Sequence, residues 1–265
     1  MKKIFFASDF HLGIDARLSS QARERQIVRW LDQIRPEAAA LYLVGDIFDF
    51  WFEYKTVVPK GYIRLLGKLA EWRDAGIPVF YFTGNHDMWM FDYLERELGI
   101  PTYRQPIVRE LLGKTFYIGH GDGLGPGDYG YKRLKRLFAH PLSQWLFERL
   151  HPNIGYRLAS YWSARSRAKE PSPRQFLGPE QEWLVQYANQ KLDEVAADYF
   201  LFGHRHLPID YTLKNGRSRY INLGDWLTYT SYAAFDGQDL RLLFFDYDAG
   251  QVFGKSSFRQ REKQA

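Results

Sequence analysis

The sequence predicts an α/β protein with an added region of antiparallel strands, and three features support this prediction. Short apolar runs alternate with amphipathic stretches in the first half of the chain. The last third, from Tyr199 to about Phe253, is rich in Tyr, Leu, Phe and turn residues. No repeat or low-complexity tract interrupts the 265 residues. A strand–helix–strand rhythm implies a largely parallel sheet covered by helices, and we expect a single domain over residues 1–253.

The elements of the first half follow from the spacing of apolar residues. Ile27, Trp30 and Leu31, for example, recur at helical spacing and would share one buried face. The expected elements are, in order, a strand at 3–8, a helix from about Ser20, a strand at 39–45, a helix near 61–74, a strand at 77–83 and a helix that begins near Asp87.

The second half predicts a helical segment followed by strands. Residues 129–170 predict two helices, with breaks near Pro141 and again at 151–153. A helix from about 178 to 197 comes next, and antiparallel strands follow. We expect the polar end at 254–265 to be a frayed tail.

Positive charge is concentrated in the same helical segment. The chain carries 36 Lys and Arg against 31 Asp and Glu, a net charge of +5. Between positions 129 and 169, nine basic residues and one acidic residue, Glu148, give a local balance of +8. Such a segment suits an anionic partner such as nucleic acid, a phosphorylated metabolite or a membrane surface, although a solvated helix face would look the same.

Composition excludes several classes of protein. The absence of cysteine excludes disulfides and thiolate metal sites, and a hydrophobic content of 45% argues against a disordered chain. The N-terminal MKKIFFASD reaches an aspartate after four apolar residues, which is too short for the apolar part of a signal peptide. No apolar run approaches the roughly 18 residues of a membrane span. We therefore expect a cytoplasmic protein.

Five predicted strands are followed at once by residues that can bind metal ions. These stretches hold five of the seven histidines, whereas separate helix caps or core histidines would not gather after strands. Ligands of open α/β sheets lie beyond the carboxyl ends of the strands, so the five loops can converge on one site. The stretches are 8–11, 45–49, 84–87, 119–122 and 203–206.

The loops supply nitrogen and oxygen ligands and no sulfur. This set suits manganese, iron or zinc and is too rich in nitrogen for a dedicated calcium site. The candidate ligands exceed what one tetrahedral ion needs, which favours two metal ions with Asp46 as the natural bridge. Two such ions generate hydroxide and clamp the attacking and leaving oxygens of an in-line displacement at phosphorus.

The motifs D-x-H, G-D, G-N-H-[DE], G-H and G-H-x-H occur in full and in order between Asp9 and His206. In this respect the chain resembles the calcineurin-like metallophosphoesterases. The resemblance implies a four-layer sandwich of two mixed β-sheets flanked by helices. It implies one divalent metal bound by Asp9, His11, Asp46 and His206, and a second bound by Asp46, Asn85, His120 and His204.

The same resemblance implies roles in the 84–87 loop. Asn85 would bind a metal and stabilise charge on the phosphoryl oxygens. His86 would stabilise the transition state or protonate the leaving oxygen, and Asp87 would orient His86.

A narrower resemblance concerns the helical segment. HGDGLGPGDYGY and ARSRAKE, with the motifs, are similar to the UDP-2,3-diacylglucosamine diphosphatases of lipid A biosynthesis, a family in which a helical lid, here 129–170, covers the acyl chains. The similarity implies Mn²⁺, a UDP-linked diacylated sugar lipid as substrate, and a peripheral position on the inner face of the cytoplasmic membrane. Substrate contacts are implied for Asp128, Tyr131, Ser166 and Lys169.

His86 departs from the narrower pattern, because well-known members carry Arg at this position. Action on another phospholipid, a nucleotide or a phosphodiester therefore stays open as an alternative. A cationic and aromatic segment over the site suits an anionic lipid, and we do not expect a nucleic-acid partner. The sequence makes no prediction of oligomeric state.

Overall fold

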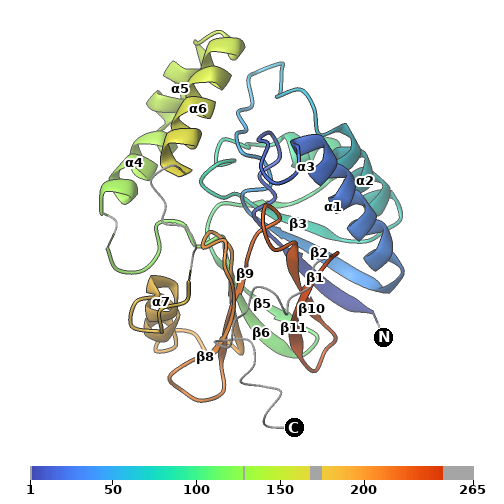
Figure 1. Cartoon of the computed structure of the whole chain (residues 1–265), viewed down its shortest axis with the longest axis vertical. Coiled ribbons are helices and arrows are strands. Elements are labelled where there is room, and N and C mark those ends of the chain that lie inside the picture. The colour runs from blue at the N-terminus through green and yellow to red at the C-terminus, as the bar shows by residue number, and fades with distance from the viewer. Residues whose placement is uncertain (1, 128, 168–174, 247–265) are drawn as a thin grey trace.

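Two β-sheets lie face to face between helices in the computed structural model, which describes residues 2–127, 129–167 and 175–246 except for the side chains of 164–167 (Figure 1). The first sheet has six strands in the order β11-β10-β1-β2-β3-β4, and the second has five in the order β5-β6-β7-β9-β8. Both sheets are mixed: β1 to β4 run parallel while β10 and β11 are antiparallel, and β6, β7 and β9 run parallel between antiparallel edge strands.

The element bounds are as follows. The first sheet contains β1 (Lys3–Ala7), β2 (Ala38–Val44), β3 (Val79–Phe82), β4 (Thr102–Tyr103), β10 (Ser231–Phe235) and β11 (Leu240–Phe244). The second contains β5 (Ile107–Leu111), β6 (Lys114–Ile118), β7 (Tyr199–Phe202), β8 (Pro208–Thr212) and β9 (Arg219–Leu223). The helices are α1 (Ser20–Ile34), the 3₁₀ turn η1 (Arg35–Glu37), α2 (Ile63–Asp74), α3 (Tyr93–Leu98), α4 (Tyr129–Ala139), α5 (Pro141–Glu148), α6 (Pro152–Arg167) and α7 (Trp183–Lys191).

Successive side chains of a strand point to opposite faces of its sheet, and this divides the core into layers. In β1, Phe5 and Ala7 face the helices α1 and α2, whereas Ile4 and Phe6 face the second sheet. The far face of the second sheet packs against α7 through a third apolar cluster. The expected four-layer sandwich is therefore confirmed, and each fully buried large side chain in it contributes roughly 1.5–3 kcal/mol.

Three expected helices differ from the structure. No helix begins at Asp87, because Trp89 packs into an aromatic cluster instead, and the helix of this region starts at Tyr93. The helix expected at 178–197 is limited to α7, since the chain turns after Lys191 toward β7. The basic segment forms three helices, not two, because Pro141 and Pro152 each begin a new helix at a position where proline fits.

The helices α4, α5 and α6 form a separate group at one end of the sandwich, upper left in Figure 1. They are attached through Phe147, which packs with Phe50, Phe52 and Trp89. Within the described residues, none of the helices combines the length and apolarity needed to cross a membrane.

Candidate dinuclear metal centre

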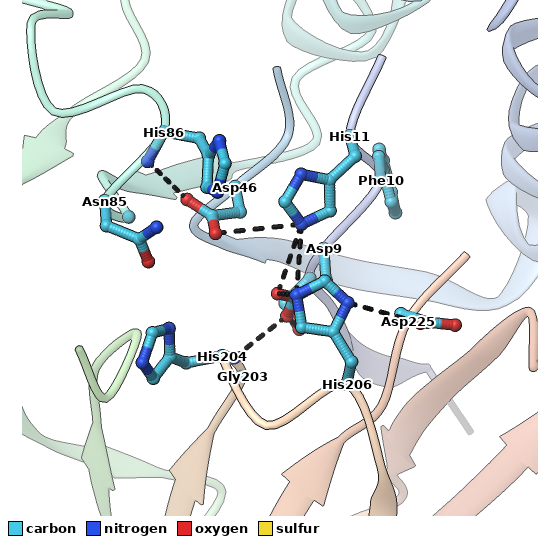
Figure 2. A network of polar contacts seen from close by, with 12 residues as sticks. Asp9, Phe10, His11, Asp46, Asn85, His86, Gly203, His204, His206 and Asp225 are labelled. Atoms are coloured by element: carbon cyan, nitrogen blue, oxygen red, sulfur yellow. Dashed lines mark hydrogen bonds and ion pairs between the residues drawn. The ribbon is translucent and has the colours of Figure 1, made fainter. Parts of the chain in front are cut away.

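The metal-type side chains of five loops meet at one edge of the sandwich. Figure 2 shows those that follow β1, β2, β3 and β7. Both sheets direct the carboxyl ends of parallel strands to this edge, so residues far apart in the chain become neighbours. The contributing residues are Asp9 and His11 after β1, Asp46 after β2, Asn85 and His86 after β3, His120 after β6, and His204 and His206 after β7.

Asp46 belongs to two groups of candidate ligands. Its Oδ2 atom lies 3.7 Å from Nε2 of His11 and 3.2 Å from Nε2 of His120. The Oδ1 atom of Asn85 lies 3.3 Å from the same His120 nitrogen and so joins the second group. A shared carboxylate is what two closely spaced metal ions require. Ligand atoms lie within 4.8 Å of one another in each group, which are Asp9, His11, Asp46 and His206, and Asp46, His120 and His204.

The ligand histidines turn Nε2 toward the centre. Nδ1 of His120 lies 2.8 Å from the carbonyl oxygen of Val44, and since a carbonyl only accepts, Nδ1 carries a proton. Nδ1 of His11 faces Oδ1 of Asp49 at 3.2 Å and donates to it. In each neutral ring Nε2 is therefore the atom with a free lone pair, as a metal ligand needs.

Two buried carboxylate oxygens, Oδ1 of Asp9 and Oδ2 of Asp46, have no hydrogen-bond partner within the described part of the chain. The Asp9 oxygen lies 3.2 Å from Nε2 of His206, and that nitrogen lies 3.2 Å from Nε2 of His11. Acceptors that face one another away from water require cations between them. The residues therefore fit divalent metal ions.

The carboxylates around these rings favour positive charge at the centre. Burial lowers the pKa of His120, but the charge and hydrogen bond of Asp46 outweigh it and raise this pKa to about 10. Burial of His11 is likewise outweighed by its hydrogen bond to Asp49, and its pKa rises to about 10. Carboxylates that stabilise a protonated imidazole so strongly also attract metal cations. Burial and then the charge of His120 lower the pKa of His204 to about 4, which keeps this ring neutral.

Most of the ligand residues have a strained backbone. Among the described residues, nine non-glycine residues have positive φ, and five of them are expected ligands. Left-handed backbone costs on the order of 1 kcal/mol or more for a residue with a Cβ. Strain concentrated at the strand ends indicates a functional requirement, namely that the side chains point across the edge toward one another. The five are Asp9, His11, Asp46, His204 and His206.

Two motif glycines allow ligands to approach the backbone. A Cβ at Gly203 would lie 2.5 Å from Oδ2 of Asp9. A Cβ at Gly84 would overlap the carboxylate of Asp46 and lie 2.7 Å from its backbone nitrogen. Any other residue would displace the ligand.

His86 is oriented by two oxygen atoms. Its Nδ1 lies 2.9 Å from the carbonyl oxygen of Asp49 and 3.2 Å from Oγ of Ser163 on α6. Because the carbonyl accepts, Nδ1 carries the proton and Nε2 is available to a substrate. The role expected for His86 at the leaving oxygen stays a prediction.

Asp87 has other contacts than those expected. Its buried carboxylate accepts hydrogen bonds from the backbone N–H groups of Ile47 at 2.9 Å and Gly84 at 2.6 Å, and from the hydroxyl of Tyr81. Burial raises its pKa to about 6. Among the described contacts of His86, none involves the Asp87 carboxylate. The contacts of Asp87 fix the backbone of the loops that carry the ligands, and the role expected for Asp87 in orienting His86 stays a prediction.

Two carboxylates that the sequence interpretation left unassigned orient ligands. Asp49 accepts from His11, as described, and Oδ2 of Asp225 lies 3.2 Å from Nδ1 of His206. Asp225 follows a glycine directly after β9, which is the layout of Gly45-Asp46. That repeated layout was the available signal.

Of the expected substrate contacts, Tyr131 is the one whose side chain the structure describes. Its hydroxyl donates to Oδ2 of Asp122 at 2.7 Å, and its ring centroid lies 6.4 Å from that of His204. Asp128, Lys169 and the side chain of Ser166 lie outside the described residues. The proposed contacts of all four with substrate stay predictions.

An apolar cavity of about 180 Å³ opens between the helices α4–α6 and the centre. Asn85 and His86 line it at the metal side, and aromatic and aliphatic side chains line the rest. Such a lining suits a hydrocarbon chain. The lining residues are Asp49, Phe50, Asn85, His86, Met88, Trp89, Tyr131, Leu134, Lys135, Phe138, Phe147, Ala159, Trp162 and Ser163.

Paired N/O ligand groups that share a carboxylate fit a two-metal hydrolase centre, which can act on phosphoesters. The family model of the calcineurin-like phosphoesterases matches residues 2–208, and the chain belongs to this family. It is accordingly a hydrolase that uses divalent metals.

Several relatives share most of the chain. A UDP-2,3-diacylglucosamine hydrolase of Porphyromonas gingivalis is 40% identical over 258 residues, which cover 91% of this chain and 96% of the relative. A protein of the same name from Aeromonas salmonicida is 28% identical and covers 83% of this chain and 85% of its own. A third protein of this name, from Edwardsiella ictaluri, is 27% identical and covers 90% of this chain and 90% of its own.

Proposed function

We propose that this hydrolase cleaves the pyrophosphate bond of UDP-2,3-diacylglucosamine in lipid A biosynthesis, releases UMP and 2,3-diacylglucosamine 1-phosphate, and uses two Mn²⁺ ions. The apolar cavity beside Asn85 and His86 carries the proposal. A phosphoesterase for small soluble nucleotides needs no apolar space next to its metal ions, whereas a diacylated substrate does. The names of the relatives support the same substrate.

Each side chain of the site would have its own role in the reaction. Bound metal ions would supply hydroxide and stabilise charge at phosphorus. The amide of Asn85 would donate to a phosphoryl oxygen. His86, when protonated on both nitrogens, would keep Nδ1–H directed to the carbonyl of Asp49 and present Nε2–H to the leaving oxygen as acid or hydrogen-bond donor. One ion would be held by Asp9, His11, Asp46 and His206, and the other by Asp46, Asn85, His120 and His204.

We also propose that the enzyme works on the inner face of the cytoplasmic membrane, with helices α4 and α5 against the lipid. Leu142, Trp145 and Leu146 share one face of α5 and are each at least 50% exposed. Leu137 on α4 is also exposed, and basic residues of α4 lie beside it. Exposed apolar groups flanked by cations are typical of an interfacial helix on an anionic membrane.

The test is to incubate the purified protein with Mn²⁺ and UDP-2,3-diacylglucosamine and to measure UMP. We expect UMP from the wild type and none from Asp46→Asn. Hydrolysis of bis(p-nitrophenyl) phosphate without release of UMP would refute the substrate and favour a general phosphodiesterase. Activities with Mg²⁺, Zn²⁺ and Fe²⁺ at equal concentration test the metal, and sedimentation with anionic against neutral vesicles tests the membrane contact.

A further inference from the structure

We propose that Ser163 is a positioning residue for hydrolysis. Through it, the helix α6 fixes the orientation of His86 and of the Asp49 carboxylate, which accepts a hydrogen bond from His11. The proposal rests on the hydrolase assignment of the metal centre and does not depend on the identity of the substrate.

The Ser163 hydroxyl lies between two groups of the site. Its Oγ donates to Oδ2 of Asp49 at 3.0 Å and lies 3.2 Å from Nδ1 of His86. Since Nδ1 of His86 carries a proton, Oγ accepts from the ring while it donates to the carboxylate. Ser163 is buried, with an exposed fraction of 8%, so water does not readily replace it.

Asp49 links this contact to a metal ligand. Its Oδ1 accepts from Nδ1 of His11 at 3.2 Å, and its backbone carbonyl accepts from Nδ1 of His86 at 2.9 Å. A hydroxyl on Oδ2 therefore holds the carboxylate in the rotation in which Oδ1 meets His11. Ser163 thus acts on His86, the proposed acid, and through Asp49 on His11, which belongs to the ligand group of Asp9.

Through Ser163, the helices above the cavity contact the groups that orient His86. On the other side of the centre, α4 is joined to Asp122 by Tyr131 at 2.7 Å and Lys135 at 2.7 Å. Only when α6 lies as observed does Ser163 reach His86. Productive orientation of His86 therefore depends on the observed position of α6 beside Asp49.

The test compares Ser163→Thr with Ser163→Val, which have the same shape and differ in the hydroxyl. With bis(p-nitrophenyl) phosphate and saturating Mn²⁺, we expect kcat of the Val variant to fall about 10–100-fold below that of the Thr variant, the range for partners that orient metal ligands, with similar KM. Equal kcat values for the two variants, or a difference confined to KM, would overturn the proposal.

A second readout needs no turnover. The chain has seven histidines, so the ring N–H signals of protein labelled with ¹⁵N-histidine can be assigned, with His86→Gln identifying that of His86. We expect the Nδ1–H of His86 to exchange with water faster in the Val than in the Thr variant, and Mn²⁺ to bind more weakly. Identical exchange and affinity in the two variants would contradict the proposal. Failure of the wild type to release UMP while these differences persist would refute the substrate alone.

Discussion

Oδ2 of Asp225 lies 3.2 Å from Nδ1 of His206, and both side chains are buried. Because Nδ1 donates to this carboxylate, Nε2 of His206 is directed to Asp9. The other oxygen of Asp225 accepts from the backbone N–H of Thr228 at 2.8 Å, which prevents the carboxylate from turning away. We therefore expect Asp225, which lies outside the five motifs, to contribute to metal affinity.

Replacement of Asp225 by Asn should weaken metal binding by about 10–100-fold, because a neutral amide is a poorer acceptor for Nδ1–H of His206. Calorimetric titration with Mn²⁺ measures the effect. Asp193→Asn is the control, since Asp193 is 72% exposed and pairs only at the surface with Lys214. An equal loss of affinity in both variants would show that the loss is not specific to the bond with His206.

Gly84→Ala should abolish activity without unfolding the protein, because the added Cβ would displace the carboxylate of Asp46. We expect a loss of bound metal, measured by elemental analysis, with an unchanged far-UV circular dichroism spectrum. Gly67→Ala is the matched control: it lies in α2 with nothing within 4 Å of its Cβ, and it should stabilise the fold by about 0.5–1 kcal/mol. If Gly84→Ala retains metal and activity, the steric argument is wrong.

The fold and the metal ligands could be predicted because their signals are local. Apolar periodicity located β1, α1, β2, α2 and β3 to within about two residues, and each ligand motif lies directly after its strand. Ligand convergence then followed from the rule that parallel strands end at one edge.

The remaining features depend on contacts between distant segments, which periodicity does not encode. Asp87 lies next to His86 in sequence, yet its partners are Ile47 and Tyr81. Trp89 was read as part of a helix but is held by aromatic packing. Antiparallel strands were expected throughout the last third of the chain, yet β7 pairs with β9 in parallel. This pairing depends on how the sheet is assembled and not on the pattern of either strand.

Removal of metal should lower the melting temperature, because the buried acceptors of Asp9 and Asp46 then face one another. Metal at 100 times its dissociation constant would stabilise the native state by about 2.7 kcal/mol per site. Scanning calorimetry with EDTA and with Mn²⁺ measures the shift. Asp46→Asn, which reduces the buried charge and removes the shared ligand, should show a smaller shift. A wild-type melting temperature indifferent to metal would contradict the assignment of the centre.

Ala159→Phe should impair hydrolysis of the diacylated nucleotide much more than hydrolysis of a small diester. Ala159 lines the apolar cavity and packs against the aromatic cluster, so an added ring would fill space meant for an acyl chain. We expect KM for UDP-2,3-diacylglucosamine to rise at least about tenfold, equivalent to about 1.4 kcal/mol of binding. Ala196→Phe, which adds the same ring at an exposed position outside α4–α6, should leave KM unchanged. An equal loss with bis(p-nitrophenyl) phosphate would mean that the new ring disturbs the metal centre, and the cavity would then lose its assignment as the lipid site.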